Sequence, residues 1–259
     1  MVLDPREQPR VNVLGVGISA LNMETALSNT ESLLDRGEQG YVCVTGVHGI
    51  MEAQADKPFA DILNHSFLTT PDGMPTVWLG RLQGFKLMRR VYGPDYMLGL
   101  CDRSVAKGYR HFLYGGKPGV AEELRAALTQ RFPGLKIVGT YTPPFRPLNP
   151  AEEEGLRNQL ETSQADVFWC GLSTPKQERF MAAYSGRLPV RLMVGVGAAF
   201  DLLSGNLDEA PDWMKSAGLQ WLYRLIKEPR RLWRRYLLNN PKFAWLTFLQ
   251  LTGLKGFGK

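Results

Sequence analysis

Apolar residues recur along the chain with two alternating periods, and this pattern predicts an α/β fold. Short apolar runs with the length of buried strands occur at residues 41–45, 111–114, 135–140, 167–171 and 190–196. Stretches with helical spacing of apolar positions occur at residues 95–107, 120–132, 152–161 and 175–184. Strands separated by such helices indicate right-handed βαβ units. We therefore expect a Rossmann-like, mostly parallel sheet flanked by helices.

The amino-terminal segment contains a candidate dinucleotide fingerprint. Residues 11–17 predict a strand running into a turn, and a helix is expected to follow with Ser19 as its N-cap. Residues 15–20 match the relaxed pattern G-x-G-x-x-A, with Asp35 at about the expected separation. Asp35 lies at a polar helix end, however, and not at the tip of a second strand. A nicotinamide-dependent oxidoreductase is therefore an alternative hypothesis.

The sequence Pro71-Asp72-Gly73 holds one carboxylate in a tight turn between two apolar runs. Proline fixes φ and glycine permits positive φ, so these residues are typical of turns. Asp72 is either a cap for this turn or a candidate for acid–base chemistry. Thr45 and His48 follow the strand at 41–45, and open α/β sheets bind ligands at that end of their strands. A structural histidine at the start of a helix is the alternative for His48.

Two glycine turns follow predicted strands, at Gly115 and at Gly197. Such turns bring backbone N–H groups close to a phosphate, and Asp201 is placed to accept hydrogen bonds from ribose hydroxyls. Each turn alone is compatible with an ordinary βα connection. Together they favour a nucleotide-binding crevice at the carboxyl ends of the strands.

The chain has 259 residues and a net charge of +6, and this positive charge is confined to one segment. Residues 213–259 hold ten lysines and arginines against one acid, a net charge of +9, whereas the other 212 residues have a net charge of −3. Such asymmetry indicates an anionic partner for the segment. We expect two parts, an α/β core at 1–212 and a basic helical appendage at 213–259.

The composition of the appendage favours contact with a membrane surface. Tryptophan and arginine alternate with leucine and phenylalanine, as in interfacial segments, and each basic residue adds about 1 kcal/mol at an anionic leaflet. Arg224, Arg231 and Arg234 share one helical face if the helix continues across Pro229. The alternatives are a helical hairpin packed on the core, nucleic-acid binding, and a membrane-binding module without catalysis.

The same residues bear on cellular location. No apolar run reaches the roughly 18 residues of a membrane span, and the polar residues 1–10 predict no secretory signal. Three scattered cysteines suit a reducing compartment. We expect a peripheral protein at the cytoplasmic face of a membrane.

Six short motifs occur in order and together resemble one family. They are Thr45 after a strand, Pro71-Asp72-Gly73, Arg-Val-Tyr-Gly-Pro-Asp at 90–95, Gly-Leu-Ser-Thr-Pro-Lys-Gln-Glu at 171–178, Gly-Val-Gly-Ala-Ala-Phe-Asp at 195–201 and Leu-Gln-Trp-Leu-Tyr-Arg-Leu at 219–225. The ordered set resembles the WecG/TagA/CpsF family of bacterial glycosyltransferases (glycosyltransferase family 26), over about residues 11–241. The resemblance implies a Rossmann-like fold and an inverting, metal-independent transfer from a UDP-sugar to a polyprenyl-diphosphate-linked glycan.

The resemblance also implies roles for individual residues. Asp72 is the general base, Thr45 assists it, Gln177 lines the substrate pocket and Asp201 binds the uridine ribose. Arginines of the appendage complete the site at the membrane, and the matching positions are Arg224, Arg231 and Arg234. We expect the partners to be the donor, the lipid-linked acceptor and an anionic membrane, not a nucleic acid; homo-oligomerisation is left open.

The phrases Pro-Asp-Gly-Met-Pro and Gly-Leu-Ser-Thr-Pro-Lys-Gln-Glu look more like the exopolysaccharide branch of the family, which includes xanthan-type β-glucosyltransferases. Hexose transfer from a donor such as UDP-glucose is therefore the main expectation, with N-acetylmannosaminyl transfer as its alternative.

The chemistry implied by the resemblance agrees with the residue types. Inverting transfer needs one base that deprotonates the acceptor hydroxyl. The UDP leaving group needs cations, and the sequence has no Asp-x-Asp motif that would hold a metal. Arginines are permanently charged and bidentate toward phosphate, so they can replace the metal. We expect no metal and no cofactor.

Overall fold

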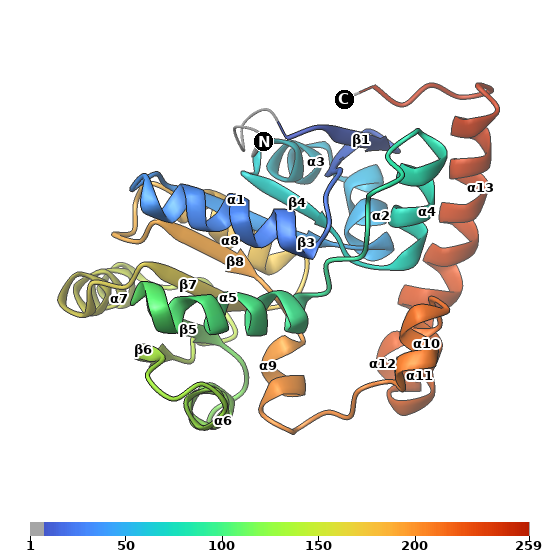
Figure 1. Ribbon diagram of the computed structural model, residues 1–259. Helices are drawn as coiled ribbons and strands as arrows, with labels where there is room; N and C mark the ends of the chain where they lie inside the picture. Colours follow the sequence, from blue (N-terminus) through green and yellow to red (C-terminus); the bar gives the residue numbers. More distant parts are fainter. Residues whose placement is uncertain (1–7, 259) are drawn as a thin grey trace.

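A computed structural model describes residues 8–258 and has a six-stranded, entirely parallel sheet at its centre (Figure 1). The strand order is β4-β3-β8-β7-β5-β6. The strands are β3 (Gly40–Thr45), β4 (Leu68–Pro71), β5 (Arg110–Gly115), β6 (Lys136–Tyr141), β7 (Val167–Gly171) and β8 (Leu192–Gly195). The predicted α/β fold is confirmed. Most of the stretch for which we expect no secretory signal lies outside the described residues.

Each face of the sheet carries its own hydrophobic core because side chains alternate along every strand. In β3, Val42 and Val44 pack into one core, while Tyr41 and Cys43 pack into the other. The first core is covered by α1 (Met23–Asp35), α5 (Gly93–Lys107), α6 (Val120–Arg131) and α9 (Ala199–Leu203). The second is covered by α2 (Val47–Ala55), α3 (Lys57–His65), α7 (Pro150–Ser163) and α8 (Lys176–Tyr184).

The amino-terminal segment differs from the prediction. Residues 10–19 form an antiparallel hairpin of β1 (Arg10–Val13) and β2 (Val16–Ser19), with Gly15 at φ +83° in its turn. Ser19 therefore lies in a strand, and the N-cap of α1 is Asn22, whose side chain accepts a hydrogen bond from Thr25 N. A dinucleotide fingerprint requires a glycine turn that opens a helix. The match at 15–20 lies in a hairpin instead, so it gives no support to the oxidoreductase alternative.

The appendage forms a column of helices along one side of the core (Figure 1). It comprises α10 (Asp212–Ser216), α11 (Gln220–Lys227), α12 (Pro229–Trp233), the π-helical segment η2 (Arg234–Leu238) and α13 (Asn239–Leu251). Pro229 begins α12, and Glu228, with φ −130° and ψ 57°, ends α11. The condition under which Arg224 would share a helical face with Arg231 and Arg234 is therefore not met. From Pro229 onward the backbone is continuously helical, with wider turns in η2.

The end of α13 is fixed to the amino-terminal hairpin. The Gln250 side chain accepts a hydrogen bond from Leu14 N and donates one to Asn12 O, each 3.0 Å long. Asn12 in turn donates to Phe257 O at 2.7 Å. Within residues 8–258, no helix has the length and apolar character needed to cross a membrane.

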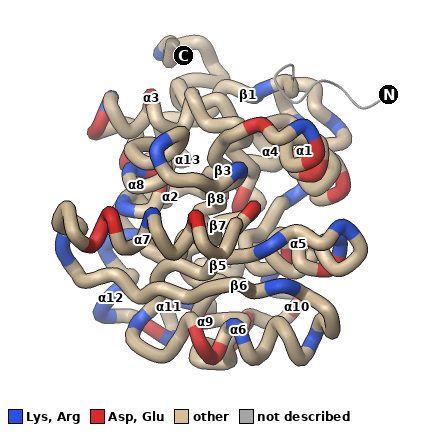
Figure 2. Tube along the Cα trace, turned by 90° about the vertical axis from the view of Figure 1, so that its left-hand side faces the viewer, with Lys and Arg blue, Asp and Glu red and all other residues tan. Residues whose placement is uncertain are grey.

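Charges of both signs are mixed on the core. Figure 2 shows basic and acidic residues side by side along α1 and α5, where Arg103 forms ion pairs with Glu24 and Glu31 at 2.6 Å. The cysteines Cys43, Cys101 and Cys170 are buried and free. The core therefore balances its charge internally, whereas the appendage carries the excess of positive charge.

Candidate active site

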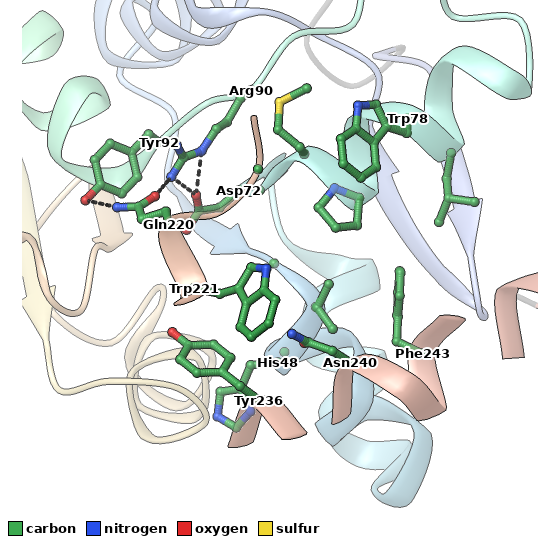
Figure 3. Close-up of a pocket in the computed structure, with 18 of the residues that line it drawn as sticks. His48, Asp72, Trp78, Arg90, Tyr92, Gln220, Trp221, Tyr236, Asn240 and Phe243 are labelled. Atoms are coloured by element: carbon green, nitrogen blue, oxygen red, sulfur yellow. Dashed lines mark hydrogen bonds and ion pairs between the residues drawn. The ribbon is translucent and has the colours of Figure 1, made fainter. Parts of the chain in front are cut away.

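A cavity of about 540 Å³ lies between the core and the appendage (Figure 3). Its lining comes from α2, from α4 (Met74–Leu82), and from α11, η2 and α13 of the appendage. It opens beyond the carboxyl ends of β3 and β4, where parallel sheets bind ligands. The volume is within the range of small-molecule sites. The strand pattern predicted this edge of the sheet, and the resemblance implied a contribution from the appendage, which forms the roof of the cavity.

Asp72 occupies a strand-to-helix turn at the edge of this cavity. Pro71 ends β4 beside Thr45, and Asp72 N donates a 3.0 Å hydrogen bond to Thr45 O. Gly73 has φ +108°, which allows α4 to begin immediately afterwards. A side chain at Gly46 would place its Cβ 2.4 Å from Asp72 O, so only glycine permits this close approach. The turn therefore presents the Asp72 carboxylate rigidly to the cavity.

Arg90 is the direct partner of Asp72. Its Nη2 lies 3.3 Å from Asp72 Oδ1, and its guanidinium stacks 4.2 Å from the centre of the Tyr92 ring. The same Nη2 donates to Gln220 Oε1, and Gln220 Nε2 donates to the Tyr92 hydroxyl at 2.6 Å (Figure 3). No sequence pattern indicated Arg90 or Gln220 as a site residue, although both belong to motifs that carry the resemblance.

Two arginines of the appendage line the cavity, Arg224 and Arg235. The Nε atoms of both are buried and have no hydrogen-bond partner. Arg224 Nη2 lies 3.6 Å from Glu228, whereas Arg235 has no ion-pair partner within residues 8–258. Burial, with Arg224 and Arg231 nearby, lowers the pKa of Arg235. A partly buried cation without a counter-charge is suited to binding an anion.

The other two arginines implied by the resemblance lie elsewhere in this structure. Arg231 forms an ion pair with Glu228, and its side chain is 58% exposed. Arg234 is also exposed, and neither residue lines the cavity. The break at Glu228 and the π turns of η2 change the helical phase, which directs Arg235 and Tyr236 toward the cavity instead. The roles predicted for Arg231 and Arg234 stay predictions.

A cluster of buried polar side chains lies near the cavity. The Thr45 hydroxyl and Gln177 Oε1 are buried and have no hydrogen-bond partner. Gln177 Nε2 and the Thr174 hydroxyl donate to Glu178 Oε1, at 3.0 and 2.8 Å. Burial raises the pKa of Glu178. Buried polar groups are normally hydrogen-bonded, so the unpaired atoms of Thr45 and Gln177 are unusual, although neither residue lines the cavity.

The glycine turns lie on the same edge of the sheet but outside the cavity lining. Gly115 ends β5 at φ +127°, and Gly197 follows β8 at φ +50°. A Cβ at Gly197 would lie 3.5 Å from Gln177 Oε1, which places this turn beside the polar cluster. Asp201 lies one helical turn further on, in α9. Its predicted contact with the ribose stays a prediction.

His48 lines the cavity from α2 and is neutral at pH 7. Burial and the nearby Arg235 lower its pKa to about 4, against a weaker opposing effect of a hydrogen bond with the Thr174 backbone. Its Nδ1 is buried, has no hydrogen-bond partner and lies 3.7 Å from Glu52 Oε1. A neutral imidazole next to Arg235 adds a hydrogen-bonding group to the cavity and no charge.

Replacing His48 by glutamine is expected to flatten the acid side of the stability profile. An unfolded histidine has a pKa of about 6.5, and the folded pKa is about 4. Between these values the unfolded chain binds a proton that the folded chain does not, so stability is lost as the pH falls. From pH 7 to pH 5, urea unfolding should show a loss about 2 kcal/mol larger in the wild type than in His48→Gln.

The control for this measurement is His65→Gln, at an exposed histidine of α3. It should leave the slope of stability against pH as it is in the wild type. Equal slopes for His48→Gln and the wild type would show that His48 accepts its proton in the folded chain.

No group of three or more His, Cys, Asp or Glu side chains among residues 8–258 is arranged to hold a metal ion. The metal-independent reaction implied by the resemblance stays a prediction. Four cationic side chains line the cavity and can stabilise a phosphate: Arg90, Lys215, Arg224 and Arg235. Lys215 already forms ion pairs with Glu209 and Asp212.

Comparison with known proteins gives a consistent result over nearly the whole chain. The model of the glycosyl transferase WecG/TagA/CpsF family matches residues 11–256. An N-acetylglucosaminyldiphosphoundecaprenol N-acetyl-beta-D-mannosaminyltransferase of Bacillus subtilis (strain 168) is 31% identical over 237 residues, which cover 88% of this chain and 90% of the relative. A protein of the same name from Bacillus spizizenii (strain ATCC 23059 / NRRL B-14472 / W23) is 30% identical over 211 residues, which cover 82% and 79%.

Proposed function

Because the chain belongs to the WecG/TagA/CpsF family of glycosyltransferases, we propose that it transfers N-acetylmannosamine from a UDP-linked donor to an N-acetylglucosaminyl diphosphate carried on a polyprenol. The main support is the placement of one carboxylate, Asp72, in a cavity that also contains Arg224 and Arg235, whose buried Nε atoms have no hydrogen-bond partner. The names of the two Bacillus relatives supply the sugar and the acceptor.

The residues of the cavity can be assigned to the steps of an inverting transfer. The acceptor hydroxyl attacks the anomeric carbon of the donor while Asp72 takes its proton, and the bond to UDP breaks on the opposite face. Negative charge then develops on the diphosphate, and Arg224 and Arg235 are placed to stabilise it. Arg90 is the partner that orients Asp72. Transfer would thus need residues from both the core and the appendage.

The donor sugar supported by the comparisons differs from the glucose expected from the sequence. Two phrases of the sequence favoured a glucosyltransferase branch, whereas both relatives are named N-acetylmannosaminyltransferases. The N-acetylmannosaminyl alternative is therefore better supported than glucosyl transfer. The nicotinamide oxidoreductase and the membrane-binding module without catalysis do not fit membership of a glycosyltransferase family.

The location proposed for the reaction is the cytoplasmic face of the bacterial inner membrane, with the protein bound peripherally. The net charge of +9 in residues 213–259 and the exposed Trp213, Trp233 and Trp245 support this location. Since the appendage also roofs the cavity, membrane binding and assembly of the site would be coupled.

A donor screen tests the proposal. The full chain is mixed with an N-acetylglucosaminyl diphosphate prenol and, separately, with the UDP derivatives of N-acetylmannosamine, N-acetylglucosamine and glucose, and the release of UDP is measured. We expect acceptor-dependent release to be fastest with UDP-N-acetylmannosamine. Fastest release with UDP-glucose would restore the glucosyl prediction, and acceptor-independent release with every donor would contradict the proposed transfer.

A further inference from the structure

The cavity beside Asp72 has two chemically different halves. One half is polar and cationic, and its lining includes Arg90, Tyr92, Gln220, Arg224 and Arg235. The other half is a groove between α4 and α13. It is lined by Met74, Pro75, Trp78, Leu79, Leu82, Phe243, Ala244 and Thr247. Figure 3 shows Trp78 and Phe243 on the side of Asp72 away from Arg90 and Tyr92.

The groove between α4 and α13, which we call the α4–α13 groove, leads out to an apolar surface. At its rim Trp78 is 48% exposed and Leu82 is 70% exposed. The exposed apolar surface continues past the end of α4 at Leu87 and along α13 at Trp245 and Phe248. A series of large exposed apolar side chains from two separate segments is typical of a binding surface.

Hydrogen-bonding groups are scarce in this groove. Its polar groups are the indole N–H of Trp78 and the Thr247 hydroxyl, which already donates to the carbonyl of Phe243 at 2.9 Å. Asn240 also lines the cavity, one helical turn before Ala244 on α13. A ribose, a uracil or a sugar ring would lose its bonds to water there without replacement. A hydrocarbon chain would instead gain from burial, by about 25 cal/mol for each Å² removed from water.

We propose that the α4–α13 groove binds the first isoprene units of a polyprenyl diphosphate. The inference rests on the proposed function, because it assigns one part of the acceptor to one half of the same cavity. Charge complementarity supports this occupant: a diphosphate that is esterified to a hydrocarbon chain needs cations at one end and an apolar channel at the other. The cationic half of the cavity, with Arg90, Lys215, Arg224 and Arg235 in its lining, provides positive charge for this diphosphate as well as for that of UDP, and the groove provides the channel.

In this arrangement α4 binds the lipid part of the acceptor, a function that the charge pattern of the appendage did not indicate. The polyprenyl group would leave the groove between Leu82 and Ala244, where the exposed apolar surface begins. The lipid would then pass directly from the cavity into a bilayer that contacts both helices. The acceptor would not have to leave the membrane fully in order to react.

Calorimetric titration of the full chain with farnesyl diphosphate and with inorganic diphosphate tests this inference. We expect the wild type to bind farnesyl diphosphate at least about tenfold more tightly, because only this ligand fills the groove. Leu82→Gln and Ala244→Gln each place an amide in the groove from an exposed helical position, so the fold should be retained. Both should remove most of the preference for farnesyl diphosphate and leave the affinity for inorganic diphosphate unchanged.

Trp245→Gln is the matched control, since Trp245 lies on α13 but does not line the cavity. It should keep the preference for farnesyl diphosphate. Equal affinities of the wild type for the two ligands, or an undiminished preference in both groove variants, would overturn the inference. If the two groove variants bound anionic vesicles more weakly but kept the preference for farnesyl diphosphate, the groove would contact the bilayer instead. This result would also overturn the inference. The titration needs no turnover, so an absence of sugar transfer would count against the proposed function alone.

Discussion

Replacing Asp72 by asparagine is expected to lower the rate of sugar transfer about a thousandfold. Asparagine has the same shape and can still accept a hydrogen bond from Arg90, which lies 3.3 Å from the Asp72 carboxylate. It cannot take the proton of the acceptor hydroxyl at neutral pH. The loss should therefore appear in kcat, and the affinity for UDP should change by less than about twofold. Single-turnover assays and calorimetric titration with UDP measure the two quantities separately.

Asp61→Asn is the control for Asp72→Asn. Asp61 is an exposed aspartate of α3 that does not line the cavity, so transfer should continue at the wild-type rate. If Asp72→Asn also turned over near the wild-type rate, another group would have to be the base. If Asp72→Asn lost UDP binding together with turnover, the carboxylate would be holding the donor site in shape.

Arg235→Met is expected to reduce transfer by about 10²- to 10³-fold and at the same time to stabilise the fold or leave it unchanged. The cation is partly buried without an ion-pair partner among the described residues, so its removal relieves an unfavourable burial. The leaving diphosphate then loses a charge-assisted donor. Stability in urea unfolding should therefore rise or stay the same while the steady-state rate of transfer falls, and this combination would not result from simple damage to the fold.

Arg230→Met provides the control, because Arg230 is an exposed arginine of the adjacent α12 and lies outside the cavity. Arg231→Met and Arg234→Met provide the decisive comparison. The resemblance to the family implies that Arg224, Arg231 and Arg234 complete the site, whereas Arg224 and Arg235 are the two of these neighbouring arginines that line the cavity. Loss of transfer in Arg231→Met and Arg234→Met, with Arg235→Met near the wild-type rate, would contradict the role of Arg235.

Local sequence features were sufficient to predict much of the fold. The apolar run at 167–171 is β7 residue for residue, and Gly108 ends α5 in the left-handed conformation that favours glycine. The prediction of a strand and a helix for the amino-terminal segment was wrong, because a strand followed by glycine and polar residues also fits a hairpin. Tertiary contacts stabilise the hairpin, among them the hydrogen bond from Asn64 Nδ2 to Gly15 O. Such contacts are not visible in a window of neighbouring residues.

The candidate site could be predicted only in part, for a similar reason. Asp72 was singled out as the carboxylate of a proline–glycine turn, and Thr45 because open α/β sheets bind ligands at the carboxyl ends of their strands. The hydrogen bond between Arg90 and Gln220 joins residues 130 positions apart, so the local pattern of apolar and polar residues cannot predict it. Arg235 was missed because a regular helix was assumed, and the π turns of η2 changed which residues face the core.

The attachment of α13 to the amino-terminal hairpin has a consequence for the order in which the protein is made. Gln250 contacts Asn12 and Leu14 across 238 and 236 residues. During synthesis the sheet and the Asp72 turn leave the ribosome long before α11 and α13, and amino-terminal parts generally fold first. A growing chain would thus hold the proposed base without Arg224, Arg235 or the α4–α13 groove. Every part of the proposed site is present only after α11 and α13 have been made, so a shorter product would lack groups that we propose to bind the nucleotide sugar.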